Sequence, residues 1–318
     1  MSGRQPQPDA PLAGIALSTM WAQRFDDDSS LEPFFADGRR LGFDRFEVGH
    51  VVSRPAALEL VPGRYKIASV HSPCPGDLMA AGASLAHPES DRRREAATAL
   101  VRSIELAERL GAGAVMFHLG KVEWDTDLKR AAFELASRTL GGQAHTERWC
   151  AARDRLVQAI GRVERDALAR ASDALGPACE AARGAGIALA FETGHSPLEL
   201  PTPRGGEWLL DQLGAHGLTA WLDTGHVAAQ AAVGVSDFAD WFVSVSGRWS
   251  GVHVHDCVGL RDHLAPGTGG IDLGAVIARL PADALITLEV DWYLDDVELV
   301  AGARTVLELL GAVGPGGG

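Results

Sequence analysis

The sequence predicts an α/β protein with a single (β/α)₈ TIM-barrel domain, and three observations favour that fold. Short apolar runs alternate with longer amphipathic stretches from one end of the chain to the other, as expected of repeated strand–helix units. Eight such units suit one closed barrel in a chain of 318 residues. No GxGxxG turn opens the chain, whereas such a turn is typical of open doubly wound sheets.

Eight apolar segments are the expected barrel strands. Each is short, is rich in aliphatic residues and precedes a stretch able to form a helix. In chain order they are Gly14–Ser18, Phe43–Val48, Ile67–His71, Ala114–His118, Ile187–Glu192, Thr219–Leu222, Gly251–His255 and Leu285–Val290.

Helices are predicted most clearly where apolar residues recur at three- and four-residue steps. These segments are Leu31–Leu41, Arg92–Leu110, Ala152–Arg183, Ser236–Ser246 and Val297–Leu310. The stretch from Lys121 to Arg183 is too long for a simple connection after the fourth strand, and it contains Gly141-Gly142-Gln143. We therefore expect an extended helical insertion there, acting either as a substrate lid or as a purely structural addition.

The domain organisation expected from the sequence is simple. The barrel should span residues 13–311, between a disordered N-terminal segment, 1–12, and a disordered Gly-rich tail, 312–318. The chain shows no internal repeat and no change of composition that would mark a second domain.

The charge balance argues against nucleic acid as a partner. The chain has 42 acidic and 29 basic residues, a formal net charge of −13, which repels polyanions. Its four cysteines form no CxxC pair, and no run of about 18 apolar residues is present to cross a membrane. We expect a cytoplasmic protein with no membrane partner and a small-molecule substrate, and a homo-oligomeric state is compatible with the sequence.

Imidazole and carboxylate groups follow most of the expected strands. In a (β/α)₈ barrel these strand ends surround one mouth, so residues distant in sequence converge on a single site. Nitrogen and oxygen donors together suit a divalent metal, Mn²⁺ or Zn²⁺ first, with Co²⁺, Fe²⁺ or Mg²⁺ as alternatives. The residues at these positions are His71, His118, Glu192, Asp223, His226, His253, His255 and Glu289.

Three motifs resemble the xylose-isomerase-like TIM barrels, which include endonuclease IV, tagatose and psicose epimerases, hydroxypyruvate isomerase and inosose dehydratase. The motifs are Phe117-His118-x-Gly120, Leu222-Asp223-Thr224-x-His226 and the block from His253 to Asp272. By that resemblance four residues are expected to bind the metal shared across the superfamily. They are Glu192, Asp223, His253 and Glu289.

The resemblance also implies places for further ions. His71 and His118 match positions that hold a second ion in the endonuclease IV branch, with Glu192 bridging. His226 and His263 match two of three ligands for a third ion, but the Asp expected two residues before His263 is Arg261, and Asp262 lies one place off. This departure counts against a full trinuclear centre.

Other residues are expected to contact the substrate. A guanidinium repels cations, so Arg261 suits a substrate phosphate or carboxylate. His255 shares a strand face with His253 and is either a substrate contact or the substitute ligand. Trp21 follows the first strand and is placed near the ligand. Glu47 ends the second strand and either binds substrate or forms a structural salt bridge.

These expectations favour a metal-dependent isomerase or epimerase of a keto sugar, sugar phosphate or polyol ketone. The metal would stabilise an enediolate while Glu192 and Glu289 serve as catalytic base and acid. Two alternatives stay open. One is a metal phosphodiesterase similar to endonuclease IV, and the other is a keto-polyol dehydratase or lyase.

Overall fold

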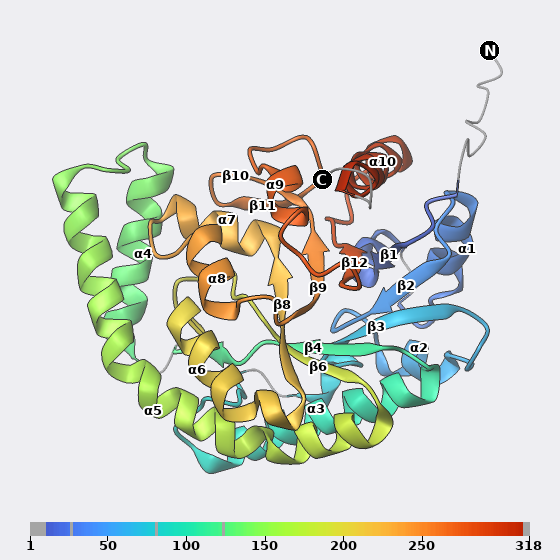
Figure 1. The fold of residues 1–318 in the computed structure, drawn as a ribbon, viewed down its shortest axis with the longest axis horizontal. Coiled ribbons are helices and arrows are strands. Elements are labelled where there is room, and N and C mark those ends of the chain that lie inside the picture. The colour runs from blue at the N-terminus through green and yellow to red at the C-terminus, as the bar shows by residue number, and fades with distance from the viewer. Residues whose placement is uncertain (1–10, 26–27, 80–81, 123–124, 314–318) are drawn as a thin grey trace.

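The computed structural model describes residues 11–25, 28–79, 82–122 and 125–313, which form a closed barrel of eight parallel strands (Figure 1). Around the barrel the strand order is β1-β12-β9-β8-β6-β4-β3-β2. The barrel strands are β1 (Ile15–Ser18), β2 (Arg45–Val48), β3 (Lys66–Ser72), β4 (Ala114–Phe117), β6 (Ala188–Glu192), β8 (Leu218–Asp223), β9 (Trp249–Val254) and β12 (Leu285–Leu288). All eight predicted strands are thus confirmed, with small shifts at their ends.

The barrel closes because β1 pairs with both β2 and β12. Ala16 lies opposite Arg45 on one side and Thr287 on the other. The middles of the strands are buried on both faces, which explains why they appear in the sequence as continuous apolar runs.

Helices surround the barrel (Figure 1). The five predicted helices correspond to α1 (Glu32–Arg40), α3 (Ser90–Leu110), α5 (Glu147–Ala185), α8 (Phe238–Val245) and α10 (Asp296–Val313). The other helical elements are η1 (Thr19–Arg24), α2 (Arg54–Glu59), η2 (Gly76–Leu78), α4 (Thr126–Leu140), α6 (Pro203–Leu213), η3 (Gly214–His216), α7 (Thr224–Ala232) and α9 (Leu273–Ile277). Among the described residues, no helix is both long and apolar enough to cross a membrane.

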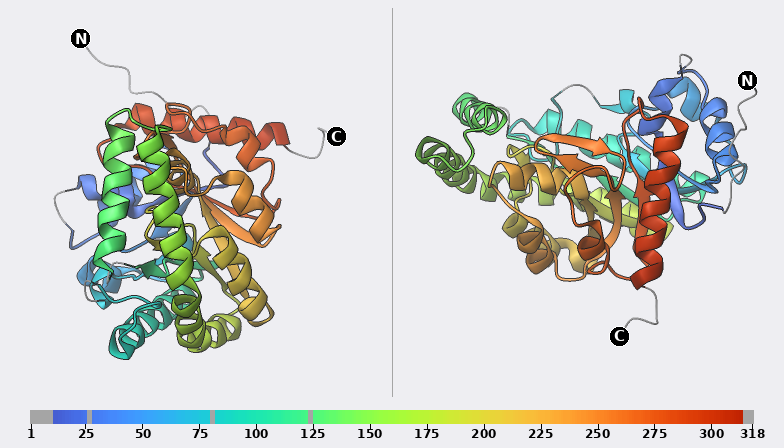
Figure 2. Two further views of the ribbon diagram at one scale, coloured as in Figure 1. Left: turned by 90° about the vertical axis from the view of Figure 1, so that its left-hand side faces the viewer. Right: turned by 90° about the horizontal axis from the view of Figure 1, so that it is seen from above.

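The predicted insertion after the fourth barrel strand is an antiparallel pair of helices, α4 and α5, which stands to one side of the barrel (Figure 2). Asp125 caps the start of α4, and the Thr146 side chain caps the start of α5. Helix α5 has 39 residues, packing against α4 and, farther along, against α3 on the barrel. The insertion is thus continuous with the barrel wall.

Two short antiparallel ribbons lie in the loops that follow barrel strands. One pairs β5 (Gly120–Lys121) with β7 (Glu199–Leu200), and the other pairs β10 (Asp256–Val258) with β11 (Arg261–Leu264). Both therefore belong to the end of the barrel where the polar residues were expected.

The ends of the barrel domain differ slightly from the expected bounds. Leu12 is buried and its N–H donates to the carbonyl of Gly42, so the packed chain begins inside the segment 1–12. At the other end α10 continues to Val313. The rest of the two segments expected to be disordered, 1–10 and 314–318, lies outside the described residues.

Candidate metal centre

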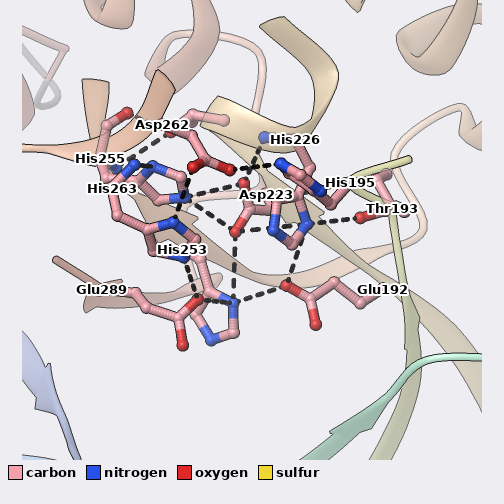
Figure 3. Close-up of polar contacts among 12 residues, drawn as sticks. Glu192, Thr193, His195, Asp223, His226, His253, His255, Asp262, His263 and Glu289 are labelled. Carbon is pink, nitrogen blue, oxygen red and sulfur yellow. Dashed lines mark hydrogen bonds and ion pairs between the residues drawn. The ribbon is translucent and has the colours of Figure 1, made fainter. Parts of the chain in front are cut away.

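The four residues expected to bind the shared metal converge at the carboxyl ends of four neighbouring strands (Figure 3). Glu192 ends β6, Asp223 ends β8, His253 lies near the end of β9, and Glu289 directly follows β12. Each offers one ligand atom, and these four atoms all lie within 4.8 Å of one another. All four side chains are buried, so the barrel itself fixes their positions.

His253 lies at the centre of this group. Its Nδ1 is 2.8 Å from Glu192 Oε1 and 3.1 Å from Glu289 Oε2. Its other nitrogen, Nε2, is 3.0 Å from Glu47 Oε1, and Glu47 also accepts a hydrogen bond from the Ser69 hydroxyl (2.7 Å). Of the two roles expected for Glu47, the geometry matches the structural one: a buried carboxylate that orients His253 and turns its Nδ1 toward the group.

His255 supports Asp223 in a similar way. Its Nδ1 accepts from the backbone N–H of His263 (2.8 Å), so its Nε2 carries the proton and donates to Asp223 Oδ1 (2.9 Å). The backbone N–H of His226 donates to the same carboxylate at 2.7 Å. His255 is fully buried, and it orients a ligand where the sequence suggested a substrate contact or a substitute for His253.

The residues expected to hold a second ion meet at the other oxygen of Glu192. Glu192 Oε2 lies 2.8 Å from His71 Nε2 and 3.3 Å from His118 Nε2. The Nδ1 of His118 lies 3.1 Å from Glu199 Oε1. Glu192 therefore contacts His253 with one oxygen and two further imidazoles with the other, and a role for these residues in binding a second ion stays a prediction.

A third group lies beside these two. His226, Asp262 and His263 also offer ligand atoms within 4.8 Å of one another (Figure 3). His226 Nδ1 lies 2.9 Å from the carbonyl of Thr193, which makes it the donor and leaves Nε2 unprotonated. The Asp262 carboxylate thus lies beside His226 and His263 although Arg261 occupies the position where the resemblance implied an aspartate.

The local backbone explains why the sequence pattern was misleading. Neighbouring residues of a regular strand point to opposite faces. The β10–β11 ribbon has an irregular register, and His263 has a positive φ of 53°. This conformation lets Asp262 and His263, although adjacent, approach each other, with Asp262 Oδ1 3.1 Å from His263 Nδ1.

Of two further residues expected beside the substrate, one lies in the core and the other lies outside the group of carboxylates. Trp21 is fully buried, packs against Phe34, and donates its indole N–H to the carbonyl of Leu294 (3.1 Å). Because its ring is large and mostly apolar, burial among aromatic side chains stabilises it more than a place in the polar mouth would. Arg261 is exposed and donates to the Tyr293 hydroxyl (3.1 Å), with no described contact to the carboxylates of the centre.

The charges within the centre are balanced by imidazoles. Burial alone would raise the pKa of Glu192, but the imidazoles of His118, His253 and His71 outweigh it and hold that pKa well below its ordinary range. Burial would lower the pKa of His253, yet Glu289, Glu47 and Glu192 raise it well above its usual value. The same competition, with Glu192 and Glu199 prevailing, raises the pKa of His118 to about 9.

This donor set fits a divalent metal. Among the described residues, only imidazoles form ion pairs with Glu47, Glu192, Asp223 and Glu289, although all four carboxylates are buried. Buried carboxylates need a compensating positive charge. His71 Nδ1 is in addition buried without a hydrogen-bond partner. Mixed nitrogen and oxygen donors suit Mn²⁺ or Zn²⁺.

Sequence reasoning missed two residues of the centre. Glu199 accepts from the backbone N–H groups of His195 and Ser196 and lies beside His118. His195 Nε2 lies 3.1 Å from Asp262 Oδ2, and its side chain is 45% exposed. His195 comes three residues after Glu192, so its place after a strand was a usable indication. Glu199 depends on the β5–β7 ribbon, which the sequence pattern does not reveal.

Comparison with known proteins places this fold in a family. A family model described as xylose isomerase-like TIM barrel matches residues 35–310, whereas no curated protein sequence matches the chain. Similar solved structures include an L-ribulose 3-epimerase (18% identity, TM-score 0.60, covering 94% of this chain and 95% of that one). Another is the IOLI protein with a bound zinc atom (12% identity, TM-score 0.65, covering 95% of this chain and 99% of that one). A third is a Thermus thermophilus protein soaked with zinc chloride (21% identity, TM-score 0.57, covering 96% of this chain and 99% of that one). The chain belongs to the xylose isomerase-like TIM barrel family.

Proposed function

We propose that the protein is a divalent-metal-dependent isomerase or epimerase of a keto sugar, sugar phosphate or polyol ketone. The observation that carries this proposal is the placement of two glutamates. Glu192 and Glu289 lie at the two ends of the arc β6-β8-β9-β12, and both adjoin Nδ1 of His253. Carboxylates on two sides of one site suit the removal of a proton and its return.

Glu192, Asp223, His253 and Glu289 would hold the metal. When bound, the ion would polarise the substrate carbonyl and the adjacent hydroxyl, which makes the neighbouring C–H more acidic and stabilises the enediolate. Glu47 and His255 keep His253 and Asp223 in position through the contacts described above. The similarity of the fold to an L-ribulose 3-epimerase, and to a Clostridium cellulolyticum D-psicose 3-epimerase solved with D-tagatose, supports a carbohydrate-like substrate.

We assign proton removal to Glu289 and proton return to Glu192, which must first take up a proton from solvent because the neighbouring imidazoles keep its carboxylate ionised. Both oxygens of Glu192 face imidazoles at 2.8 Å, so its carboxylate is held firmly. Glu289 Oε1 has a single described hydrogen bond, a long one of 3.3 Å from the Ser18 hydroxyl. Glu289 therefore has the oxygen more available to the substrate.

Solvent deuterium exchange tests the proposal. Metal-replete protein should incorporate deuterium at the carbon next to the carbonyl in at least one member of a panel of ketoses and their phosphate esters. Absence of exchange across the panel, with the metal site shown to be filled, would reject the isomerase and epimerase function.

A second candidate is a metal phosphodiesterase, and the group formed by His226, Asp262 and His263 favours it. With the groups around His71 and His253, the mouth offers donors for more than one ion, and clustered ions activate water and clamp a phosphate. The net charge of −13 counts against DNA as the substrate. Nicking of duplex DNA at an abasic site, abolished by a chelator, would replace the first proposal with this one.

A further inference from the structure

Two large aromatic side chains lie exposed in the loop that follows β12. Trp292 is 50% exposed and Tyr293 is 45% exposed, and their ring centres are 6.2 Å apart in an edge-on arrangement. The loop starts directly after Glu289, and the N–H of Asp291 donates to the carbonyl of His263 (3.0 Å). The loop that carries the two rings therefore borders the metal centre as part of its rim, and exposed aromatic groups beside a polar site are typical of ligand binding.

Arg261 joins this rim. Its Nη2 donates to the Tyr293 hydroxyl (3.1 Å), and its guanidinium carbon lies 5.7 Å from the centre of the Tyr293 ring. Among the described residues no carboxylate forms a direct ion pair with this guanidinium, although the charge of Asp291 acts on both Arg261 and Tyr293. Arg261 precedes His263 by two residues, which limits the separation of their backbones to about 7 Å. A cation held by a phenol thus lies exposed close to the metal centre.

We propose that Trp292, Tyr293 and Arg261 form a subsite for the phosphate end of a phosphorylated keto sugar. The guanidinium presents a planar fork of donors that matches phosphate oxygens. The indole of Trp292 offers an apolar face to the C–H groups of the carbon chain. This inference rests on the proposed isomerase function for the reacting end of the substrate, and it specifies the substrate class as ketose phosphates.

The charge distribution supports this choice. The inner carboxylates are compensated by imidazoles and, when it is bound, by a metal, so they recognise the carbonyl and hydroxyl end of a substrate. The rim offers a guanidinium that forms no direct ion pair with a described carboxylate and is attracted by Asp291 without direct contact. A free ketose has no charged group that would bind to this guanidinium. A phosphate group at the far end of the same substrate would bind to such a positively charged side chain.

The experiment compares matched pairs of substrates on metal-replete, full-length protein. D-Ribulose is paired with D-ribulose 5-phosphate, and D-fructose with D-fructose 6-phosphate, with solvent deuterium exchange as the readout. We expect kcat/KM to be at least about tenfold higher for the phosphate ester. Arg261→Ala should lower kcat/KM for the phosphate ester much more than kcat/KM for the free ketose, and Tyr293→Phe should have an intermediate effect. Arg304→Ala, which removes an exposed arginine of α10, is the matched control. It should change kcat/KM neither for the phosphate ester nor for the free ketose.

Two results on active protein would overturn the subsite and leave the isomerase function intact. One is equal kcat/KM for the ester and the free ketose. The other is an equal loss for both substrates in Arg261→Ala.

If no compound in the panel exchanges deuterium, the proposed function fails and binding alone decides the subsite. Quenching of tryptophan fluorescence by D-ribulose 5-phosphate should then be weaker in Arg261→Ala than in the unaltered protein, and equal affinity would reject the subsite. Adenosine monophosphate serves as a competitor, because its base also stacks on aromatic rings. Tighter, Arg261-dependent binding of this nucleotide than of either ester would overturn the assignment to sugars.

Discussion

The inner and outer parts of the metal centre are built differently. The inner residues, Glu192, Asp223, His253 and Glu289, are at most 4% exposed and lie at or next to the ends of barrel strands. The outer group consists of His226, Asp262 and His263. Its members Asp262 and His263 lie on the β10–β11 ribbon, where their side chains are 15% and 17% exposed. The barrel thus fixes one group rigidly, while a ribbon carries most of the other. We expect the inner group to determine metal binding and proton transfer, and the outer group to adjust ion number and substrate fit.

The largest effect should come from Glu289→Gln. This change keeps the shape of the side chain and removes the base, so the rate of deuterium exchange should fall by about 10²–10⁴-fold. Circular dichroism should show that the fold is retained. Glu308→Gln, an exposed position on α10, is the control. Exchange at the unaltered rate in Glu289→Gln would remove Glu289 from the mechanism.

A smaller effect is expected at Glu47, which contacts His253 of the inner group but is not one of the four expected metal ligands. Glu47→Gln removes the charge that orients His253, and the affinity for the metal should fall by about 10–100-fold. Competition with a chelator of known affinity measures the change. Ser69→Ala removes only a hydrogen bond to Glu47 and should weaken binding less. Equal affinity in Glu47→Gln and the unaltered protein would show that the inner group needs no such support.

The metal-free protein should lose stability as the pH rises. The pKa of His118 is raised from 6.5 to about 9, mainly because Glu192 and Glu199 overcome the opposing effect of burial. Stabilisation by the protonated imidazole is complete below pH 6.5 and is lost as the pH passes 9. The free energy of unfolding should fall by up to about 3 kcal/mol across that window. Urea denaturation at a series of pH values measures this free energy. His118→Gln should remove the part of the pH dependence that comes from His118. A free energy of unfolding that rises with pH in the unaltered protein but not in His118→Gln would contradict the assignment.

The smallest effect on deuterium exchange should come from the outer group. Asp262→Asn removes one carboxylate near His226 and His263, so the number of bound ions should fall while the inner ion remains. The exchange rate should fall less than in Glu289→Gln. A complete loss of exchange in Asp262→Asn would mean that the two groups act as one unit.

The inner group was predictable from the sequence because its positions follow from the barrel. Residues such as Glu192 and Asp223 end apolar runs, and parallel strands of a barrel all end at the same mouth. The family resemblance then indicated which four of them to expect around one ion, and ligand atoms of these four lie within 4.8 Å of one another. The same rule predicted that His71 and His118 lie at the same mouth as Glu192.

The positions of Asp262 and Glu199 could not be predicted from the sequence, because the geometry of the two short ribbons determines them. Asp262 reaches His226 and His263 only through the irregular register of β10–β11 and the positive φ of His263. Glu199 approaches His118 through the β5–β7 ribbon, which joins segments about 80 residues apart in the chain. Trp21 was misplaced because its position after a strand indicates closeness to the mouth but not the direction in which the ring points.

The most direct test of the central claim is the metal content of two variants, Asp223→Ala and Asp262→Ala, compared with the unaltered protein. Each is purified without added metal and analysed by inductively coupled plasma mass spectrometry. We predict that Asp223→Ala loses the tightly bound ion and all deuterium exchange, whereas Asp262→Ala retains at least one ion per chain. Retention of the ion in Asp223→Ala, or its complete loss in Asp262→Ala alone, would contradict the assignment of the resident metal to the inner group.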